Sequence, residues 1–480
     1  MVAVRRKKTS KTARSSFEAN IQNAAIPRLS GNYRRRMWLL MFAADLLGFL
    51  LTVGAVLLIN QIVPLFRPDL DDLKYLVVVV LCWGFLVTSR LYPGVGVNPA
   101  DEIKLVTQSV SLGILIGLAI FTAFDVGWVA NGLAFGLGWA GTILSVVLCR
   151  WVIKIFATQM NVWGEPVIVV SKGPAAEELA DYFLKRRRLG LVPVRIMADL
   201  AMLGGLQEDH YLKKKIYTAV VGHLPAFNLD ASTVRKLSAM FKNVIFISSD
   251  LFIGTSVQIR DLEGLLGFEA SRNILTQSEL VIKRLMDVVL VVVSSVVTMP
   301  ICIVVALLIR LEGHGPIFYM QERIGLNGQK FKIFKFRTMV SDAERQLQDY
   351  LKNNADARRE WRESQKLRRD PRITRIGRWL RKWSLDELPQ VLNVLKGEMS
   401  LVGPRPMLEN QVSVYGTRIK MYITMRPGLS GMWQVSGRNK TTFEERADFD
   451  SYYVTHWSIW LDLYILLRTI WVVARRDGVY

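Results

Sequence analysis

The chain has 480 residues, enough for two or three domains, and 51% of them are hydrophobic. The apolar residues gather into long runs, which excludes a purely soluble protein. The net charge of +21 crowds the flanks of those runs and the turns, which disfavours a nucleic-acid-binding protein. The cysteines Cys82, Cys149 and Cys302 lie in apolar runs without a CxxC pair, so we expect neither disulfides nor a zinc site.

Residues 1–36 form a basic arm in which Glu18 is the single acidic residue. The apolar run that follows is long enough for a complete span, which a cleaved signal peptide would not have. An excess of Lys and Arg marks the cytosolic side of a membrane protein. We therefore predict that this arm lies in the cytosol.

Residues 37–157 are expected to form a bundle of transmembrane helices, because about 20 mainly apolar residues are needed to cross a bilayer. The loop containing Asp69 and Asp71 has no excess of cations, whereas Arg150 and Lys154 lie at the end of the last span. This pattern places everything after about residue 158 in the cytosol. The expected spans are 37–60, 75–92, 105–128 and 132–157.

Residues 158–250 alternate between short apolar runs and helix-like segments, which predicts a small parallel α/β domain of degenerate Rossmann-like type. The loop that follows the first run, 171–176, has one glycine followed by a proline and lacks the dinucleotide-binding glycines. We expect a structural or oligomerising module. The expected strands are 166–170, 192–197, 217–221 and 244–248, with helices near 174–187 and 230–242.

Two features follow the α/β domain. Residues 251–280 are expected to be a linker or a dimerisation hairpin. The apolar run 288–309 is long enough for a span, but Pro300 removes a backbone donor and favours a kink or break. A crossing would place the basic residues of 311–480 outside, against the positive-inside bias. We therefore predict a re-entrant membrane helix over 285–311, bent at Pro300, which returns to the cytosol.

The segment Ser384 to Gln390 contains two adjacent carboxylates, Asp386 and Glu387, directly after a basic stripe. Arginines at a three-residue step lie close together on one helix face, and cations beside a carboxylate at a helix start indicate phosphoryl transfer. A structural explanation is also open, because Ser384 and Glu387 fit a capping box. The stripe consists of Arg372, Arg375, Arg378 and Arg381, and could also face a membrane surface.

Residues 281–480 resemble the catalytic domain of the bacterial polyprenyl-phosphate sugar-1-phosphate transferases, the monotopic phosphoglycosyl transferases. The N-terminal spans and the α/β domain resemble the large members of this family. The similarity implies a mainly α catalytic domain and a homodimer formed through 165–280. It rests on Lys283-Arg284, Lys335-Phe336-Arg337, Asp370-Pro371-Arg372, Ser384 to Gln390, Leu395-Lys396-Gly397, Gly403-Pro404-Arg405-Pro406 and Trp433 to Asn439.

The resemblance implies that Asp386 attacks the β-phosphorus of a UDP-sugar, so that UMP leaves and a phosphosugar-aspartyl enzyme forms. Undecaprenyl phosphate then accepts the hexose-1-phosphate, with galactose-1-phosphate expected. Asp386 and Glu387 are the expected Mg²⁺ ligands. Relatives often break the re-entrant helix at Ser-Pro, whereas this chain has Met299-Pro300, so Thr298 or Ser295 is expected to replace the serine's bond. The expected phosphate-binding cations are Lys335, Arg337, Arg381, Arg405 and Arg438.

Three alternatives remain open on the sequence. No residue decides the sugar, so the same reaction with glucose-1-phosphate is the nearest one. A catalytically dead membrane scaffold or regulator of polysaccharide assembly is another. A membrane-tethered nucleotide-sugar dehydrogenase or epimerase would require NAD, and the missing glycines disfavour it.

Overall fold

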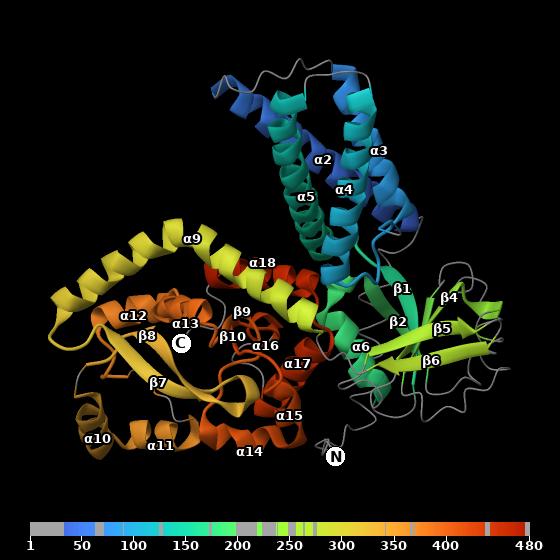
Figure 1. Ribbon diagram of the computed structural model, residues 1–480. Coiled ribbons are helices and arrows are strands. Elements are labelled where there is room, and N and C mark those ends of the chain that lie inside the picture. The colour runs from blue at the N-terminus through green and yellow to red at the C-terminus, as the bar shows by residue number, and fades with distance from the viewer. Residues whose placement is uncertain are drawn as a thin grey trace. The chain divides into compact units, whose positions relative to one another are not determined.

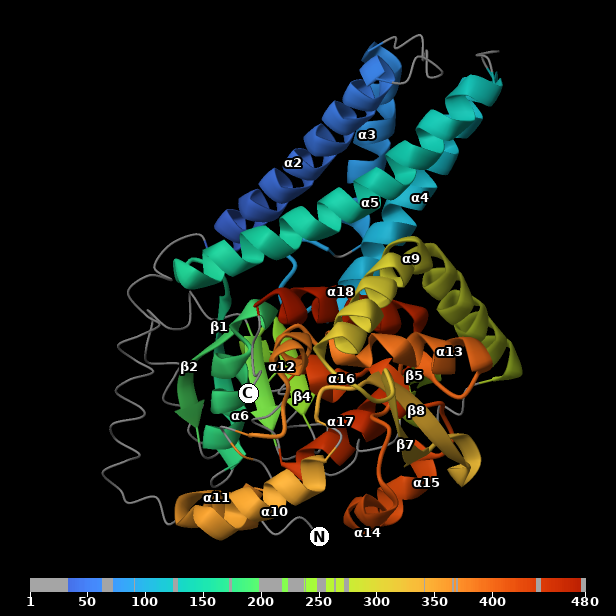
Figure 2. The ribbon, with the colours of Figure 1, turned by 90° about the vertical axis from the view of Figure 1, so that its left-hand side faces the viewer.

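A computed structural model describes most of residues 33–475 (Figures 1 and 2). The chain divides into two compact units, Met1–Leu251 and Phe252–Tyr480, which are described separately. Most of the basic arm 1–36 lies outside the described residues. Within 33–475, the residues outside the description are 63–71, 90, 124–127, 172–174, 198–217, 223–236, 238, 248–255, 263–264, 272–275, 341, 365–366, 368–369 and 437–441.

The first unit contains the expected bundle of apolar helices. By length and composition, α2, α4 and α5 could cross a membrane, while the apolar part of α3, Leu76–Thr88, is shorter. Large apolar side chains such as Leu50 and Leu115 remain exposed on the bundle, as expected for surfaces that face lipid. The helices are α2 (Tyr33–Ile62), α3 (Asp72–Thr88), α4 (Pro99–Ala123) and α5 (Trp128–Gln159).

Buried ion pairs fix α5 against its neighbours. Arg150 donates to both carboxylate oxygens of Asp45 on α2, at 2.5 and 2.7 Å, and both side chains are fully buried. Lys154 pairs with Glu102 on α4 at 2.7 Å. The sequence places these two cations at the membrane interface, and the structure adds that each has an acidic partner on another helix.

A parallel sheet with the strand order β2-β1-β3-β4 forms the rest of the first unit. The four predicted strands are confirmed, and α6 (Ala175–Lys185) confirms the first predicted helix. Most of the second predicted helix and residues 172–174 of the glycine-poor loop lie outside the described residues, so the Rossmann-like assignment stays a prediction. The strands are β1 (Glu165–Val170), β2 (Leu191–Met197), β3 (Thr218–Gly222) and β4 (Asn243–Ile247), and η1 (Arg187–Leu189) precedes β2.

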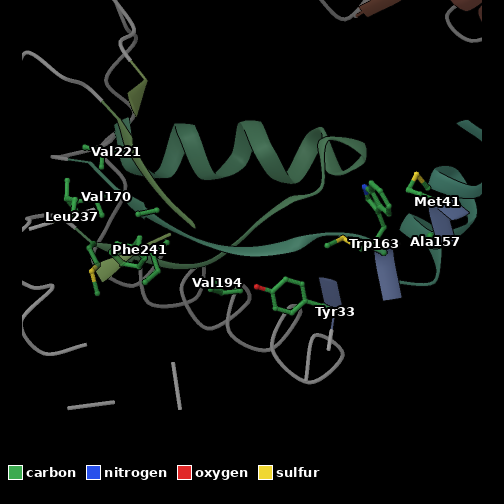
Figure 3. Close-up of a cluster of buried hydrophobic side chains, with 13 residues drawn as sticks. Tyr33, Met41, Ala157, Trp163, Val170, Val194, Val221, Leu237 and Phe241 are labelled. Carbon is green, nitrogen blue, oxygen red and sulfur yellow. The ribbon is translucent and has the colours of Figure 1, made fainter. Parts of the chain in front are cut away.

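One hydrophobic cluster joins the sheet to the helical bundle. Figure 3 shows Tyr33 at the start of α2 and Ala157 near the end of α5 in the same cluster as Val170 and Val194 of the sheet. Trp163, which lies between α5 and β1, is also buried there. The end of the bundle and the sheet therefore share a core.

The second unit begins with an antiparallel hairpin of β5 (Ser256–Leu262) and β6 (Leu265–Ser271). A hairpin was one of the two expectations for this segment, and its role in dimerisation stays a prediction.

Helix α9 (Gln277–Glu312) then runs for 36 residues with Pro300 inside it. Figures 1 and 2 show α9 as a bent but continuous helix, so the kink is confirmed and a full break is not. The hydroxyls of Ser294 and Ser295 donate to the carbonyls of Val291 and Val292, bonds that favour helix bending.

Both halves of α9 pack on the second unit. Near its start, Lys283 forms a buried 2.6 Å ion pair with Asp462, and Asp287 accepts from the main-chain N–H of Leu401. Near its end, Val305 and Ile309 are buried in a cluster that also contains Phe336 and Leu380. The outer side is apolar and exposed, with Val296 77% and Val293 67% accessible.

Short elements make up the rest of this unit, which is mainly helical as expected. Two charged helices, α10 and α11, follow the hairpin of β7 and β8. The other elements are β7 (Phe318–Ile324), η4 (Leu326–Gly328), β8 (Lys330–Phe336), α10 (Ala343–Asn353), α11 (Ala355–Ser364), α12 (Arg375–Lys382), η5 (Leu385–Gln390), α13 (Val391–Lys396), β9 (Ser400–Val402), η6 (Glu409–Gln411), α14 (Val412–Tyr415), η7 (Gly416–Arg418), α15 (Ile419–Tyr422), β10 (Gly428–Ser430), α16 (Met432–Ser436), α17 (Phe443–Thr455) and α18 (Ile459–Arg475).

Candidate active site

The carboxylate pair lies on a short 3₁₀ helix. Asp386 and Glu387 occupy the first turn of η5, and the preceding Ser384 has a left-handed backbone with φ 55°. The side chain of Ser384 makes no capping bond, so the capping-box interpretation is wrong. A left-handed conformation costs a non-glycine residue about 1–2 kcal/mol, and such backbone strain is often found at functional sites.

Lys335, near the end of β8, binds one member of the pair. Its Nζ lies 2.6 Å from Oε1 of Glu387. Burial would raise the pKa of Glu387, but Lys335, and then Arg405 and Arg323, hold it below the usual range. For Asp386, burial raises the pKa and the neighbouring Glu387 raises it further, against the opposing charges of Lys335 and Arg381. The two adjacent acids therefore differ in environment.

Arg381 approaches the pair from the last turn of α12. Its Nε donates to Oγ1 of Thr338 at 3.0 Å, and the charge of Asp386 raises the pKa of Arg381 against the larger lowering caused by burial. Asp370 and Arg372 form a bidentate pair beside it, at 2.8 and 2.7 Å. The structure therefore brings together Asp386, Glu387, Lys335 and Arg381, as expected.

Arg405 is held by two backbone turns that pack against each other. Gly403 donates to the carbonyl of Ser430, and Gly428 donates to that of Pro404. A Cβ atom built on Gly428 would lie 2.0 Å from the nitrogen of Gly403, so only glycine permits this approach. These contacts fix the turn that carries Arg405, and the charge of Arg405 lowers the pKa of Glu387.

A buried tryptophan contacts two cations. The guanidinium carbons of Arg405 and Arg446 each lie 4.8 Å from the ring centroid of Trp433. Burial lowers the pKa of Arg446, and the charge of Arg405 lowers it further. Tyr415 donates to the fully buried carboxylate of Asp450 at 2.9 Å. Burial raises the pKa of Asp450 to about 7, although Tyr415, Arg405 and Arg446 oppose this shift.

Arg323 was missed as a candidate site residue. It lies on β7, and its charge lowers the pKa of Glu387, while burial and then Arg405 lower its own pKa. Its Nε is buried without a hydrogen-bond partner among the described residues. In the sequence, Arg323 is a single cation in the segment Gln321-Glu322-Arg323-Ile324-Gly325. This signal is too weak to predict a site residue without the contacts that the fold creates.

Arg337, one of the expected phosphate-binding residues, makes its hydrogen bonds away from the pair. Arg337 donates to the carbonyls of Ile309, Gly313 and His314, so it holds the end of α9 instead. Arg438 lies outside the described residues. A phosphate-binding role for either residue stays a prediction.

The basic stripe does not share one helix face. Helix α12 begins at Arg375, after the N-cap Thr374, so Arg372 precedes the helix and pairs with Asp370. Arg381 is half-buried at the site, whereas Arg375 and Arg378 are exposed. The three-residue spacing of the arginines did not show that the helix begins only at Arg375.

The carboxylate pair is also the candidate metal site. Among the described residues, no group of three or more His, Cys, Asp or Glu side chains could enclose a metal ion. Two carboxylates nevertheless fit Mg²⁺, because this ion commonly takes one or two from the protein and completes its shell with water and substrate phosphates. The donor set at Asp386 and Glu387 is therefore suitable for Mg²⁺ only together with a phosphate ligand.

Comparison with known proteins gives a consistent result. Residues 278–476 match the family described as bacterial sugar transferase. The chain is 30% identical to the UDP-galactose-lipid carrier transferase of Erwinia amylovora, covering 91% of this chain and 96% of that protein. It is 30% identical to the undecaprenyl-phosphate galactose phosphotransferase of Salmonella typhimurium, over 88% and 91% of the two chains. It is 29% identical to the UDP-glucose:undecaprenyl-phosphate glucose-1-phosphate transferase of Escherichia coli, over 78% and 82%.

Proposed function

Because the chain belongs to the bacterial sugar transferase family, we propose that it transfers a hexose-1-phosphate from a UDP-sugar to undecaprenyl phosphate and releases UMP. This reaction would begin the repeat units of an O-antigen, capsule or exopolysaccharide. The observation that carries the proposal is the partly buried pair Asp386 and Glu387, with Lys335, Arg381 and Arg405 directed toward it by separate elements.

In the first step, a carboxylate oxygen of Asp386 bonds to the β-phosphorus of the UDP-sugar. The bond from that phosphorus to the bridging oxygen breaks, and UMP leaves with the electron pair. In the second step, an oxygen of undecaprenyl phosphate attacks the same phosphorus, and the carboxylate of Asp386 is released. A covalent intermediate of this kind replaces one difficult displacement by two easier ones.

The surrounding cations fit the charges of this reaction. Lys335, Arg381 and Arg405 are placed to bind phosphate oxygens and to stabilise the negative charge that moves onto UMP. Mg²⁺, held by Asp386 and Glu387, would supply further positive charge at the diphosphate. Glu387 stays ionised because Lys335 lowers its pKa. Chelation by EDTA should therefore abolish UMP release, and added Mg²⁺ should restore it.

We propose that α9 enters the bilayer and returns, which places the site on the cytosolic face of the inner membrane. A straight α9 would be about 54 Å long and could span about 30 Å of hydrocarbon. Its burial at Lys283 and Asp287 near one end, and at Val305 and Ile309 near the other, holds both halves on one unit. The exposed apolar side chains between them support insertion from one side.

Galactose is the proposed sugar. Two of the three relatives described above carry galactose in their names and one carries glucose. No described residue decides between the two sugars, so glucose-1-phosphate is the alternative. UMP release from UDP-galactose and UDP-glucose, measured with the same enzyme and acceptor, decides between them by the larger kcat/KM.

Replacement of the proposed nucleophile tests the reaction itself. Asp386→Asn should lower UMP release by more than about 10³-fold, because a neutral amide cannot act as the nucleophile that forms the acyl phosphate. Asp342→Asn is a matched control, since this carboxylate lies at the exposed start of α10. Unchanged activity in Asp386→Asn would exclude Asp386 as the nucleophile, and inactivity of the unaltered protein with every UDP-sugar would favour a scaffold.

A further inference from the structure

Helix α12 has an outer face that the proposed reaction leaves unused. Arg375, Arg378, Trp379 and Lys382 are exposed, and Trp379 is 46% accessible. These positions follow the i, i+3, i+4, i+7 spacing that gathers side chains on one side of a helix. Among the described residues, no ion pair joins any of the three cations to a carboxylate, so the face is cationic.

The inner face of α12 fixes where this charge lies. Ile376 and Leu380 pack with Val305 and Ile309 of α9. The main-chain N–H of Ile376 also donates to the carboxylate of Glu312, the last residue of α9, at 2.9 Å. Figure 1 shows α12 directly beneath one half of the bent α9. Helix α12 therefore lies beside the end of α9, where the apolar surface of α9 ends.

The other half of α9 has a similar neighbour. Arg284 donates to the carbonyls of Val394 and Leu395 at the end of α13. On α13, Leu392 is 44% exposed and Leu395 is 43% exposed. Exposed apolar side chains thus also accompany the first half of α9.

We propose that the outer face of α12 binds the headgroups of anionic phospholipids. The inference rests on the proposed function, because it takes α9 to enter the bilayer from the cytosolic side. Arginine and lysine side chains bind headgroup phosphates, and tryptophan favours the membrane interface. Anionic phospholipid is the occupant because the face is cationic and because α12 packs against α9, whose outer side is apolar and exposed.

This contact would act on the active site through one helix. Arg381 lies on α12 between the lipid-facing Arg378 and Lys382, and it reaches Asp386 electrostatically. A headgroup bound to the outer face would restrain α12 and therefore hold Arg381 in place. Anionic lipid is thus expected to increase the reaction rate.

The test compares the full chain in nanodiscs of phosphatidylcholine with nanodiscs that also contain phosphatidylglycerol. Amide hydrogen exchange of α12 should slow by about fivefold or more in the anionic nanodiscs, since each cation near an anionic surface contributes about that factor. Added salt should reduce the difference because it screens the charges. Equal exchange of α12 in the two lipids would overturn the proposal.

Two triple variants localise the effect. Arg375→Gln, Arg378→Gln and Lys382→Gln together should abolish the protection. The control combines Lys352→Gln, Arg358→Gln and Arg359→Gln, which remove the same amount of positive charge from exposed positions on α10 and α11. The protection of α12 should remain in this control. Both figures show these two helices on the side of the second unit away from α9. Protection that survives in the α12 variant would also overturn the proposal.

UMP release in the same nanodiscs separates this inference from the reaction. The unaltered protein should release UMP faster with phosphatidylglycerol, and the α12 variant should lose that increase. No UMP release in any lipid, with α12 still protected by phosphatidylglycerol, would contradict the proposed function and leave the lipid contact standing. Glycerol phosphate in solution should not protect α12, whereas equal protection by it would show a free-phosphate site instead.

Discussion

Charged side chains are grouped in the helical bundle of the first unit and around Asp386 and Glu387 in the second. The two groups differ in how many of their cations form a direct ion pair with an acid. In the helical bundle, Arg150 pairs with Asp45 and Lys154 pairs with Glu102. Around Asp386 and Glu387, by contrast, Lys335 forms the one direct ion pair between a described cation and the two acids, while Arg323, Arg381 and Arg405 act on them at longer range. The first arrangement holds helices together, and the second leaves positive charge available for phosphate.

The largest effect is expected from Arg150→Met, which should destabilise the protein by about 3–5 kcal/mol. Removing one member of a buried pair leaves the carboxylate of Asp45 without compensation. The thermal unfolding midpoint in detergent should fall, whereas UMP release per folded molecule should stay unchanged. The double variant Asp45→Asn with Arg150→Met should recover part of the loss. A stable but inactive Arg150→Met protein would contradict the structural role of this pair.

Arg405→Ala should lower kcat/KM for the UDP-sugar by about 10²–10³-fold, because removing one group that stabilises developing negative charge commonly has an effect of this size. The unfolding midpoint should change little. Arg405→Lys should recover only part of the activity, because lysine lacks the planar group that contacts Trp433. Arg345→Ala is the control, since its side chain is exposed on α10. A large loss of stability without loss of activity would place Arg405 among the structural charges.

A smaller and pH-dependent effect is expected at Asp450, whose pKa burial raises to about 7. The folded protein then holds a proton that the unfolded chain releases at about pH 4, so stability falls as pH rises from about 4 to 7. Asp450→Asn should remove this dependence, which amounts to about 2 kcal/mol between pH 5 and pH 7. Unfolding midpoints measured across this range check it, with Asp349→Asn on the surface of α10 as control. Parallel pH curves for the unaltered protein and Asp450→Asn would contradict the buried protonated carboxyl.

Much of the fold could be predicted because it follows local patterns. Apolar run length identified the helices of the bundle and α9, and short apolar runs identified the strands β1 to β4. Pro300 predicted the bend of α9 because proline removes a backbone donor. The partners of buried charges could not be predicted in this way, since Asp45 and Arg150 lie 105 positions apart in the chain.

The site was predicted in part for the same reason. Asp386, Glu387, Lys335 and Arg405 belong to distinctive short motifs, and the structure brings them together. Arg323 acquires its position only through β7 and the neighbouring turns, so its strand alone carried little signal. The prediction that the four arginines of the basic stripe share one helix face was wrong, because α12 begins after its N-cap Thr374 and Arg372 precedes it.

The most direct test of the account is the search for a covalent intermediate on Asp386. The protein is incubated with UDP-galactose and Mg²⁺ without undecaprenyl phosphate, digested at low pH and analysed by mass spectrometry. The account predicts a hexose-phosphate adduct on the peptide containing Asp386, which disappears when undecaprenyl phosphate is added. UMP release at full rate without any adduct, or an adduct on another residue, would contradict it.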